Sequence, residues 1–381
     1  MNGKVSIIGC GITGCVLARE YAEKGCAVTV YDRRNHIGGN LYDFVDEHGI
    51  LVHLYGPHIF HTNSDTVWKY VNKYGKWEPF SLVCGAVLDG VCVPTAFDFT
   101  TVDTFFPKEK AEEIKSRLTA AYPGKETATV LELLDSDDTY IREYAEFLYE
   151  KDYKPYTAKQ WAISPERIDR SIFSRVPVRL GYKKAYFDDK YQAMPKNGYT
   201  AFIGNLLAHE NIRVVLRANV TEKLRFEGNK AFIGEEAEET IVYTGALDEL
   251  FGYRFGRLPY RSLRFEWKHE DKDSFQDMPV VAYPQADGFT RITEYKKLPI
   301  QQVKGTTYAV EYPLPCSAED KGNEPYYPVL TDESKQAFEK YRALADGFDN
   351  LVCCGRLADF KYYNIDQAIE NALNIARLPL R

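Results

Sequence analysis

The feature that most constrains the fold of this 381-residue sequence is a glycine-rich segment near its start, Gly9-Cys10-Gly11-Ile12-Thr13-Gly14. It follows a short apolar run at 5–8 and precedes residues 15–24, which predict a helix. A second apolar run at 27–31 ends on Asp32. Strand, glycine turn, helix, strand and acidic residue form the Rossmann pattern, in which backbone amides bind a pyrophosphate and the carboxylate binds a ribose. The sequence therefore predicts a dinucleotide-binding α/β domain.

The residues that follow Asp32 favour FAD over NAD as the dinucleotide. The stretch 33–40 continues directly after the acidic residue and contains the pair Gly38-Gly39. A glycine pair lets the chain pass close beneath the diphosphate and ribityl groups of a longer cofactor. The stretch resembles FAD proteins of the glutathione-reductase and amine-oxidase type.

A matching piece of the cofactor site is predicted near the other end of the sequence. Residues 351–356 indicate a strand that runs into a glycine turn, and 364–376 indicate a helix with Asn364 as its N-cap. Arg356 is either a surface ion-pair residue or a ligand of the pyrophosphate, and its place just after an apolar strand favours the second role. The amides near Asp366 and Gln367 are expected to meet the flavin end.

Composition excludes several classes of function. The net charge of -7 argues against a general nucleic-acid binder. None of the eight cysteines forms a CxxC pair, so no zinc site is expected. No signal peptide and no apolar run of membrane-spanning length is present, so we expect a soluble, cytoplasmic protein without membrane insertion.

The middle of the sequence predicts a helical insertion and an antiparallel β-sheet domain, both set on the FAD-binding Rossmann-like domain. Residues 108–122, 130–134 and 140–149 have apolar residues at helical spacing, and β-rich pieces lie on both sides of them. The predicted division gives the FAD-binding domain residues 1–77, 192–250 and 316–381, the antiparallel sheet residues 78–97, 173–191 and 251–315, and the helical substrate domain residues 98–172.

Clusters of aromatic residues and arginines lie between these elements. Each cluster alone is explained by core aromatics or solvated charges, but together they suggest a site that stacks a base and binds a diphosphate. Ordered over nearly the whole chain are the segments RNHIGGN (34–40), YGPHIFHT (55–62), YTAKQW (156–161), RVPVR (175–179), YRFGRLPYRSL (253–263), TRITE (290–294), EPYYPV (324–329) and GRLADFKYY (355–363). With these segments the sequence resembles the UDP-galactopyranose mutases.

The resemblance implies an isomerase that interconverts UDP-galactopyranose and UDP-galactofuranose without net redox change. It uses FAD that is active when reduced, and the flavin N5 attacks the anomeric carbon of the sugar. The implied partners are a UDP-galactose-type nucleotide sugar and a reductant such as NAD(P)H or a reductase, and the implied assembly is a homodimer.

The resemblance also assigns roles to individual residues. Arg175 and Arg291 bind the diphosphate, and with His58 beside the flavin N5 edge they form the implied catalytic set. Tyr186, Tyr327 and Tyr362 bind phosphate oxygens. Tyr156 stacks on uracil beside Thr157 and Gln160, and Trp161 lines the sugar pocket. The cofactor-binding candidates are Gly9, Gly11, Thr13, Gly14, Asp32, Arg33, Gly39, Asn40, His58, Arg356, Tyr363, Asn364, Asp366 and Gln367, and no metal ligand is expected.

Three departures from the family pattern concern the sugar and flavin side of the site. Pro57 stands where the family commonly has alanine, and Asn364 where it has aspartate. Residues 82–84, Leu-Val-Cys, replace an Asn-x-Pro segment. These changes predict altered sugar specificity within the same reaction, for example a 6-deoxy or N-acetylated galactose on UDP or dTDP.

Two other classes of function remain open from the sequence. One is a conventional FAD oxidoreductase of the amine-oxidase or desaturase type, which would share the Rossmann unit and Gly38-Gly39. It gives no reason for the diphosphate arginines or for YTAKQW. The other is a protein that binds a nucleotide sugar or FAD without turnover.

Overall fold

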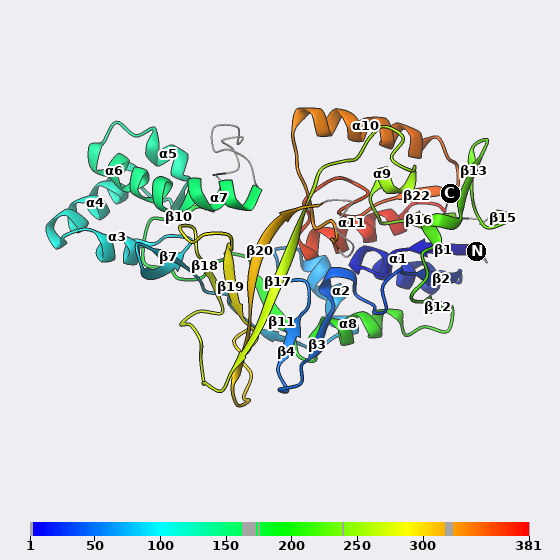
Figure 1. The fold of residues 1–381 in the computed structure, drawn as a ribbon, viewed down its shortest axis with the longest axis horizontal. Coiled ribbons are helices and arrows are strands. Elements are labelled where there is room, and N and C mark those ends of the chain that lie inside the picture. Colours follow the sequence, from blue (N-terminus) through cyan, green and yellow to red (C-terminus); the bar gives the residue numbers. More distant parts are fainter. Residues whose placement is uncertain (1–2, 162–172, 174–175, 238–239, 317–322, 381) are drawn as a thin grey trace.

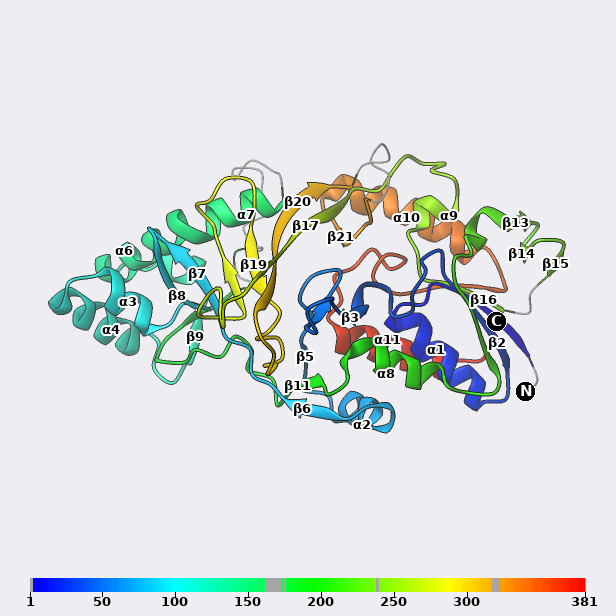
Figure 2. The same cartoon turned by 60° about the horizontal axis from the view of Figure 1, so that its bottom comes forward.

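The computed structural model describes residues 3–161, 173, 176–237, 240–316 and 323–380. Three parts follow one another along the long axis of the molecule: helices at one end, a large sheet in the middle, and an α/β part at the other end (Figure 1). The ends of the chain both lie in the α/β part, and the view turned by 60° keeps the same order (Figure 2). Within the described residues, no helix combines the length and apolar character that crossing a membrane requires.

The α/β part is built on a five-stranded parallel sheet in the order β12-β2-β1-β16-β22. Its central strand β1 (Lys4–Ile8) is buried on both faces, as expected for a parallel sheet covered by helices. The other strands are β2 (Ala27–Tyr31), β12 (Ile212–Val215), β16 (Thr240–Tyr243) and β22 (Leu351–Cys353).

Two helices near opposite ends of the sequence pack together on this sheet. They are α1 (Ile12–Glu23) and α11 (Ile365–Arg377), and α8 (Gly198–Leu207) also packs on α1. The buried face of α11 has helical spacing, with Ile365, Ile369, Ala372, Leu373 and Ala376 inside. Asn364 is its N-cap, as predicted, and the Asn364 amide donates to Gln367 Oε1 at 2.9 Å. The far side of the sheet carries α9 (Leu247–Leu250) and α10 (Asp332–Asp346).

The helical part contains α3 (Phe99–Phe105), α4 (Lys108–Ala121), α5 (Val130–Leu134), α6 (Thr139–Leu148), the π-helical turn η2 (Tyr149–Tyr153) and α7 (Lys154–Trp161). These bounds agree with the predicted helices to within a residue. Its core is separate from that of the α/β part and includes fully buried Ile114, Leu118, Ile141 and Leu148. A short antiparallel strand pair, β9 (Thr127–Ala128) with β10 (Val178–Arg179), also belongs to the helical part.

The central sheet has seven strands in the order β21-β17-β20-β19-β18-β7-β8. They are β21 (Tyr327–Pro328), β17 (Tyr260–Glu270), β20 (Thr306–Pro315), β19 (Arg291–Glu294), β18 (Val280–Ala282), β7 (Cys84–Leu88) and β8 (Val91–Thr95). Every pairing is antiparallel except that of β18 with β7, which is parallel. The sheet lies between the α/β part and the helical part (Figure 1).

Smaller elements surround the cofactor side of the molecule. They are η1 (Gly39–Leu41), β3 (Asp43–Val45), β4 (Leu51–His53), β5 (Phe60–Thr62), α2 (Asp65–Tyr74), β6 (Trp77–Pro79), β11 (Tyr191–Pro195), η5 (Val220–Lys223), β13 (Leu224–Glu227), β14 (Lys230–Ile233) and β15 (Glu236–Ala237). Strand β11 pairs with β5 and β6 in a three-stranded sheet.

Two segments pair differently from the predicted division of the chain. Val178–Arg179, expected in the antiparallel sheet, pairs with Thr127–Ala128 of the helical part. Tyr327–Pro328, expected in the FAD-binding domain, is the edge strand of the seven-stranded sheet. Both segments have only two paired residues, so composition and periodicity carry too little signal to assign them.

Candidate active site

In the glycine turn after β1, Gly9 and Gly14 lie so close to neighbouring atoms that no side chain would fit at either position. Gly9 has φ +115, and a Cβ there would lie 1.9 Å from Thr244 Oγ1. A Cβ on Gly14 would lie 2.0 Å from the Gly9 carbonyl oxygen. A Cβ on Gly11 would meet no protein atom within 4 Å. Gly9 and Gly14 are therefore required by packing, whereas Gly11 keeps open the space at the N-terminus of α1.

The second glycine pair packs directly against this turn. The Gly38 amide donates to the Cys10 carbonyl at 2.9 Å, and a Cβ on Gly39 would lie 2.9 Å from Gly11 Cα. Asp32 closes the arrangement because its carboxylate accepts from the Cys10 amide at 2.7 Å and from the Arg34 amide at 2.8 Å. The turn, the glycine pair and the acidic residue thus form one cradle.

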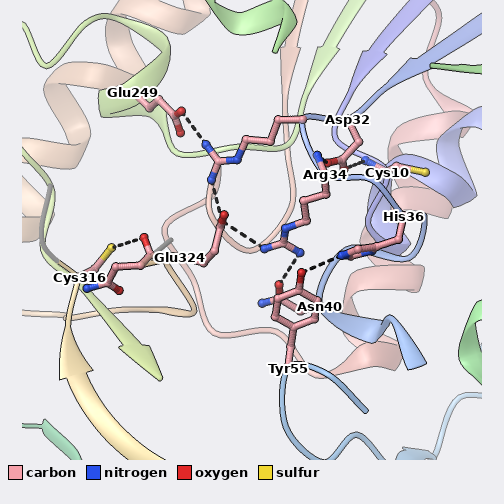
Figure 3. Close-up of polar contacts among 11 residues, drawn as sticks. Cys10, Asp32, Arg34, His36, Asn40, Tyr55, Glu249, Cys316 and Glu324 are labelled. Carbon is pink, nitrogen blue, oxygen red and sulfur yellow. Dashed lines mark hydrogen bonds and ion pairs between the residues drawn. The ribbon is translucent and has the colours of Figure 1, made fainter. Parts of the chain in front are cut away.

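Glu324 joins two arginines at the edge of this cradle, and the close-up shows it between the two guanidinium groups (Figure 3). Its Oε2 lies 2.7 Å from Arg33 Nη2 and 3.2 Å from Arg34 Nη2. Arg33 also pairs with Glu249 at 2.9 Å, and Arg34 donates to Asn40 Oδ1 at 2.9 Å. Burial acts to raise the pKa of Glu324, but Arg34 and Arg33 lower it below its ordinary value. Sequence reasoning gave no role to Arg34 or Glu324, which lie far apart in the chain.

A large cavity opens beside the cradle, with about 1190 Å³ of empty space, part of it open to solvent. The predicted cofactor residues that line it are Gly9, Gly11, Thr13, Asp32, Arg33, Gly39, Asn40, His58, Arg356 and Asn364. Other predicted residues contact the protein around it: Tyr363 Oη donates to Asp359 at 3.0 Å, and Asp366 accepts from the Gln367 amide at 2.8 Å. Among the described residues, no three His, Cys, Asp or Glu side chains gather in a way that could hold a metal ion.

His58 lies where this cavity approaches the central sheet. Its Nδ1 is 2.8 Å from the Gly56 carbonyl, and its own carbonyl accepts from Tyr199 Oη at 3.2 Å. Burial lowers the pKa of His58 to about 3, and His53, Arg356 and Arg291 lower it in the same direction. The imidazole is therefore neutral at physiological pH.

Arg291 and Glu311 form a cross-strand ion pair next to this loop. They stand opposite each other in the β19–β20 register, and Arg291 Nε lies 2.8 Å from Glu311 Oε2. Glu311 is 2% exposed. Burial acts to lower the pKa of Arg291, but Glu311 and neighbouring groups raise it above its ordinary value, so the guanidinium stays charged. Among the described residues, Arg291 pairs with Glu311 through Nε, and neither Nη group is used in this ion pair.

The predicted phosphate-binding tyrosines gather around this arginine. The rings of Tyr327 and Tyr362 are stacked at 5.2 Å, and Arg356 Cζ lies 5.2 Å from the Tyr327 centroid. Burial raises the pKa of Tyr186. The neighbouring Tyr156 and Tyr362 raise it further, whereas Arg291 lowers it. The four tyrosines and two arginines, which are widely separated in sequence, therefore share one site with polar hydroxyls and fixed positive charge.

Comparison with known sequences identifies the family of the chain. The profile of the family described as UDP-galactopyranose mutase matches residues 151–362, and that of an NAD(P)-binding Rossmann-like domain matches residues 7–74. A probable UDP-galactopyranose mutase of Klebsiella pneumoniae is 36% identical over 99% of this chain and 94% of its own length. The chain belongs to the UDP-galactopyranose mutase family. It is thus an enzyme of the isomerase class.

Other relatives mark the breadth of the mutase family and of its fold. A dTDP-fucopyranose mutase of Escherichia coli is 35% identical over 99% of this chain and 98% of its own length. A crystal structure of reduced UDP-galactopyranose mutase superposes with a TM-score of 0.68 at 15% identity, covering 99% of this chain and 93% of that one. A putative protoporphyrinogen oxidase from Exiguobacterium reaches 0.63 at 13% identity, covering 99% of this chain and 98% of that one. At such identities these structures show a shared fold.

The YTAKQW helix of this mutase-family chain is anchored to the central sheet by a lysine that sequence reasoning passed over. Lys159 Nζ donates to the carbonyls of Tyr283 at 2.7 Å and Phe289 at 2.8 Å, and also to Ala286. These carbonyls belong to the loop that leads into Arg291. Since the motif shows only a lysine on a helix, nothing in the sequence reveals this contact.

The remaining predicted substrate residues of the mutase site are placed in part. Thr157 is buried, and the Gln160 carbonyl accepts from Arg261. Arg175 lies outside the described residues, as does the side chain of Trp161.

Proposed function

We propose that this enzyme interconverts the pyranose and furanose forms of a galactose-type sugar on UDP or dTDP, with FAD as its cofactor in the reduced state. The observation that carries the proposal is the position of Arg291. Its charge acts on His58 at the cofactor cavity and on Tyr156 of α7. A diphosphate bound by Arg291 would therefore have its sugar toward the cofactor and its base toward Tyr156.

The residues that line the cavity fit FAD. Asp32 offers a carboxylate for the adenosine ribose, the space over Gly11 suits a pyrophosphate, and Arg356 supplies a positive charge. Asp32, Gly11 and Arg356 line the same cavity, so one elongated dinucleotide can contact all three.

The protein groups then divide the work of the reaction. FAD held by Asp32, the Gly11 turn and Arg356 would, when reduced, supply the nucleophile for the anomeric carbon. Arg291, with the hydroxyls of Tyr327 and Tyr362, stabilises the negative charge that grows on the diphosphate as it leaves. Arg175 is proposed to add a second cation. His58, being neutral, adds no positive charge beside the cofactor, and the Tyr199 hydroxyl fixes the position of its carbonyl.

The sugar side of the site supports a variant substrate as the second candidate. Leu82 is buried, and its carbonyl accepts from the Tyr186 amide at 2.8 Å, which places it beside the phosphate-binding tyrosines. Cys84 is buried within electrostatic range of Arg291. Apolar groups here favour a 6-deoxy sugar, as in the E. coli relative named for dTDP-fucopyranose, over a sugar with a free 6-hydroxyl. An N-acetylated galactose on UDP is the other variant.

The first experiment is anaerobic incubation of the purified protein with UDP-galactofuranose, with and without dithionite, followed by chromatography of the nucleotide sugars. We expect the pyranose to form only after reduction, with no consumption of reductant beyond the amount that reduces the flavin. Continued consumption would identify a conventional oxidoreductase. A panel of nucleotide sugars that includes dTDP-fucofuranose is tested in the same way. If the protein binds UDP but converts no sugar of this panel, it is a binding protein.

The glycine turn gives a test of the cofactor. Gly11→Ala is expected to lower FAD affinity at least about tenfold, because its Cβ enters the space proposed for the pyrophosphate, while the stability of the apoprotein changes by less than about 0.5 kcal/mol. Fluorescence titration with FAD and thermal unfolding of the apoprotein measure both. The control is Gly204→Ala in α8. The new Cβ there would lie 4.0 Å from its nearest neighbour, Ile37 Cδ1. Equal FAD affinity in both variants would contradict the assignment.

The proposal also includes the setting of the enzyme. We propose a cytoplasmic homodimer that is reduced by NAD(P)H or by a separate reductase, as the family resemblance of the sequence implies. Sedimentation tests the homodimer, and stopped-flow reduction with NADH and NADPH tests the reductant.

A further inference from the structure

Asp152 is a buried carboxyl that has no partner among the residues that the structure describes. It lies in the π-helical turn η2 and is 9% exposed. Within the part of the chain that the structure describes, no group forms a hydrogen bond or an ion pair with it. The lysines nearest in sequence pair with other carboxylates, Lys151 with Asp89 at 2.9 Å and Lys154 with Glu150 at 3.1 Å. A buried carboxyl without a partner is costly to the fold, which indicates a ligand-binding role.

The position of Asp152 assigns it to one end of the active site. It precedes Tyr156 by four residues, about one helical turn, and its charge acts on the Tyr156 hydroxyl. The charged groups that act on His58, at the cofactor end, are instead Arg356 and Arg291. Asp152 is thus next to Tyr156 and is not among the residues that line the cofactor cavity.

We infer that Asp152 recognises the pyrimidine of the substrate, its carboxyl accepting a hydrogen bond from the N3–H of a uracil or thymine stacked on Tyr156. This inference rests on the proposed function, which places the base at Tyr156. Asp152 is then a base-recognition residue that takes no part in the chemistry at the sugar.

The hydrogen-bonding pattern of the base matches a carboxyl in this environment. The edge of uracil or thymine presents an N–H donor between two carbonyl acceptors. Burial raises the pKa of Asp152 to about 7, so the protonated form is present at neutral pH. A protonated carboxyl both accepts and donates, and can therefore bind N3–H and the adjacent carbonyl together. Asparagine has the same shape and the same pair of functions, whereas alanine has neither.

The experiment measures dissociation constants of UDP, N3-methyl-UDP and pyrophosphate for the FAD-loaded enzyme by calorimetry. The proteins are wild type, Asp152→Ala, Asp152→Asn and, as a control carboxyl in the same turn, Glu150→Ala. Wild type and Glu150→Ala are expected to prefer UDP over N3-methyl-UDP by about 30-fold. Asp152→Asn keeps at least about a tenfold preference, and Asp152→Ala reduces it to within about threefold. Pyrophosphate binds equally to all four.

Two results would overturn the inference, and they are distinguishable. If the wild type binds UDP and pyrophosphate but Asp152→Ala keeps the full preference for UDP, the carboxyl does not face N3 and the proposed function stands. If the wild type binds neither UDP nor pyrophosphate, the nucleotide-sugar function itself fails. A merely structural role for Asp152 predicts that Asp152→Ala weakens all three ligands alike.

Discussion

Replacing Arg291 by alanine is expected to lower kcat/KM for the nucleotide sugar by about 10³-fold, because a fixed cation that stabilises developing charge contributes roughly 3–4 kcal/mol to the transition state. The same change should also destabilise the fold. It leaves Glu311, 2% exposed, as a buried carboxylate without its ion-pair partner, which costs about 3–5 kcal/mol. Loss of activity in this variant alone would therefore be ambiguous.

The double variant Arg291→Ala with Glu311→Gln separates the two effects. Removing the carboxylate charge together with the guanidinium should recover most of the lost thermal stability, because no uncompensated charge stays buried. Activity should remain as low as in the single variant, because the diphosphate still lacks its cation. Arg291→Lys keeps a charge for Glu311 but not the two Nη groups, and we expect it to lie between these cases. Unfolding temperatures and steady-state kinetics of the reduced enzymes are measured for wild type, Arg291→Ala, Arg291→Lys and the double variant.

Recovery of activity along with stability in the double variant would show that Arg291 acts through folding and not through the diphosphate. The proposed function would then lose the observation that carries it.

The cofactor cradle could be predicted from sequence because its parts are local. Each glycine between Gly9 and Gly14 follows from the turn after one apolar run, and Asp32 from the end of the next. Asn364 was predicted as an N-cap because capping depends on residues within one turn. The family resemblance, carried by many ordered segments, extended the prediction to Arg291 and the tyrosines.

The groups that hold these residues in place could not be predicted, because they act across long distances in the chain. Glu311 becomes the partner of Arg291 through the register of β19 with β20, which the amino-acid pattern does not specify. Glu324 reaches Arg34 from 290 residues away. In the sequence, Asp152 is one more charged residue within a helical stretch. What distinguishes it from the solvated carboxylate of Glu150 is its burial without a partner among the described residues.

Asp152→Asn is expected to stabilise the protein, and more so at alkaline than at acidic pH. The folded-state pKa of about 7 lies above the ordinary value of 3.8, so between these values the folded protein holds a proton that the unfolded chain has released. Wild-type stability therefore falls as pH rises through this window, by about 4 kcal/mol in total at 1.36 kcal/mol per unit. The variant has no proton to lose, so its advantage over wild type should grow by about 2 kcal/mol between about pH 5.5 and pH 8.

Thermal unfolding of both proteins at the two pH values, without nucleotide, measures this change as a gap in unfolding temperature that widens by a few degrees. Glu150→Gln is the matched control, because the Glu150 side chain is 57% exposed and its gap from wild type should not depend on pH in this range. A constant gap for Asp152→Asn would mean that the carboxyl is solvated in the folded protein. A widening gap, together with loss of base discrimination in Asp152→Ala, would mean that the fold carries a destabilising carboxyl at the place where the nucleotide needs one, as expected where stability is given up for function.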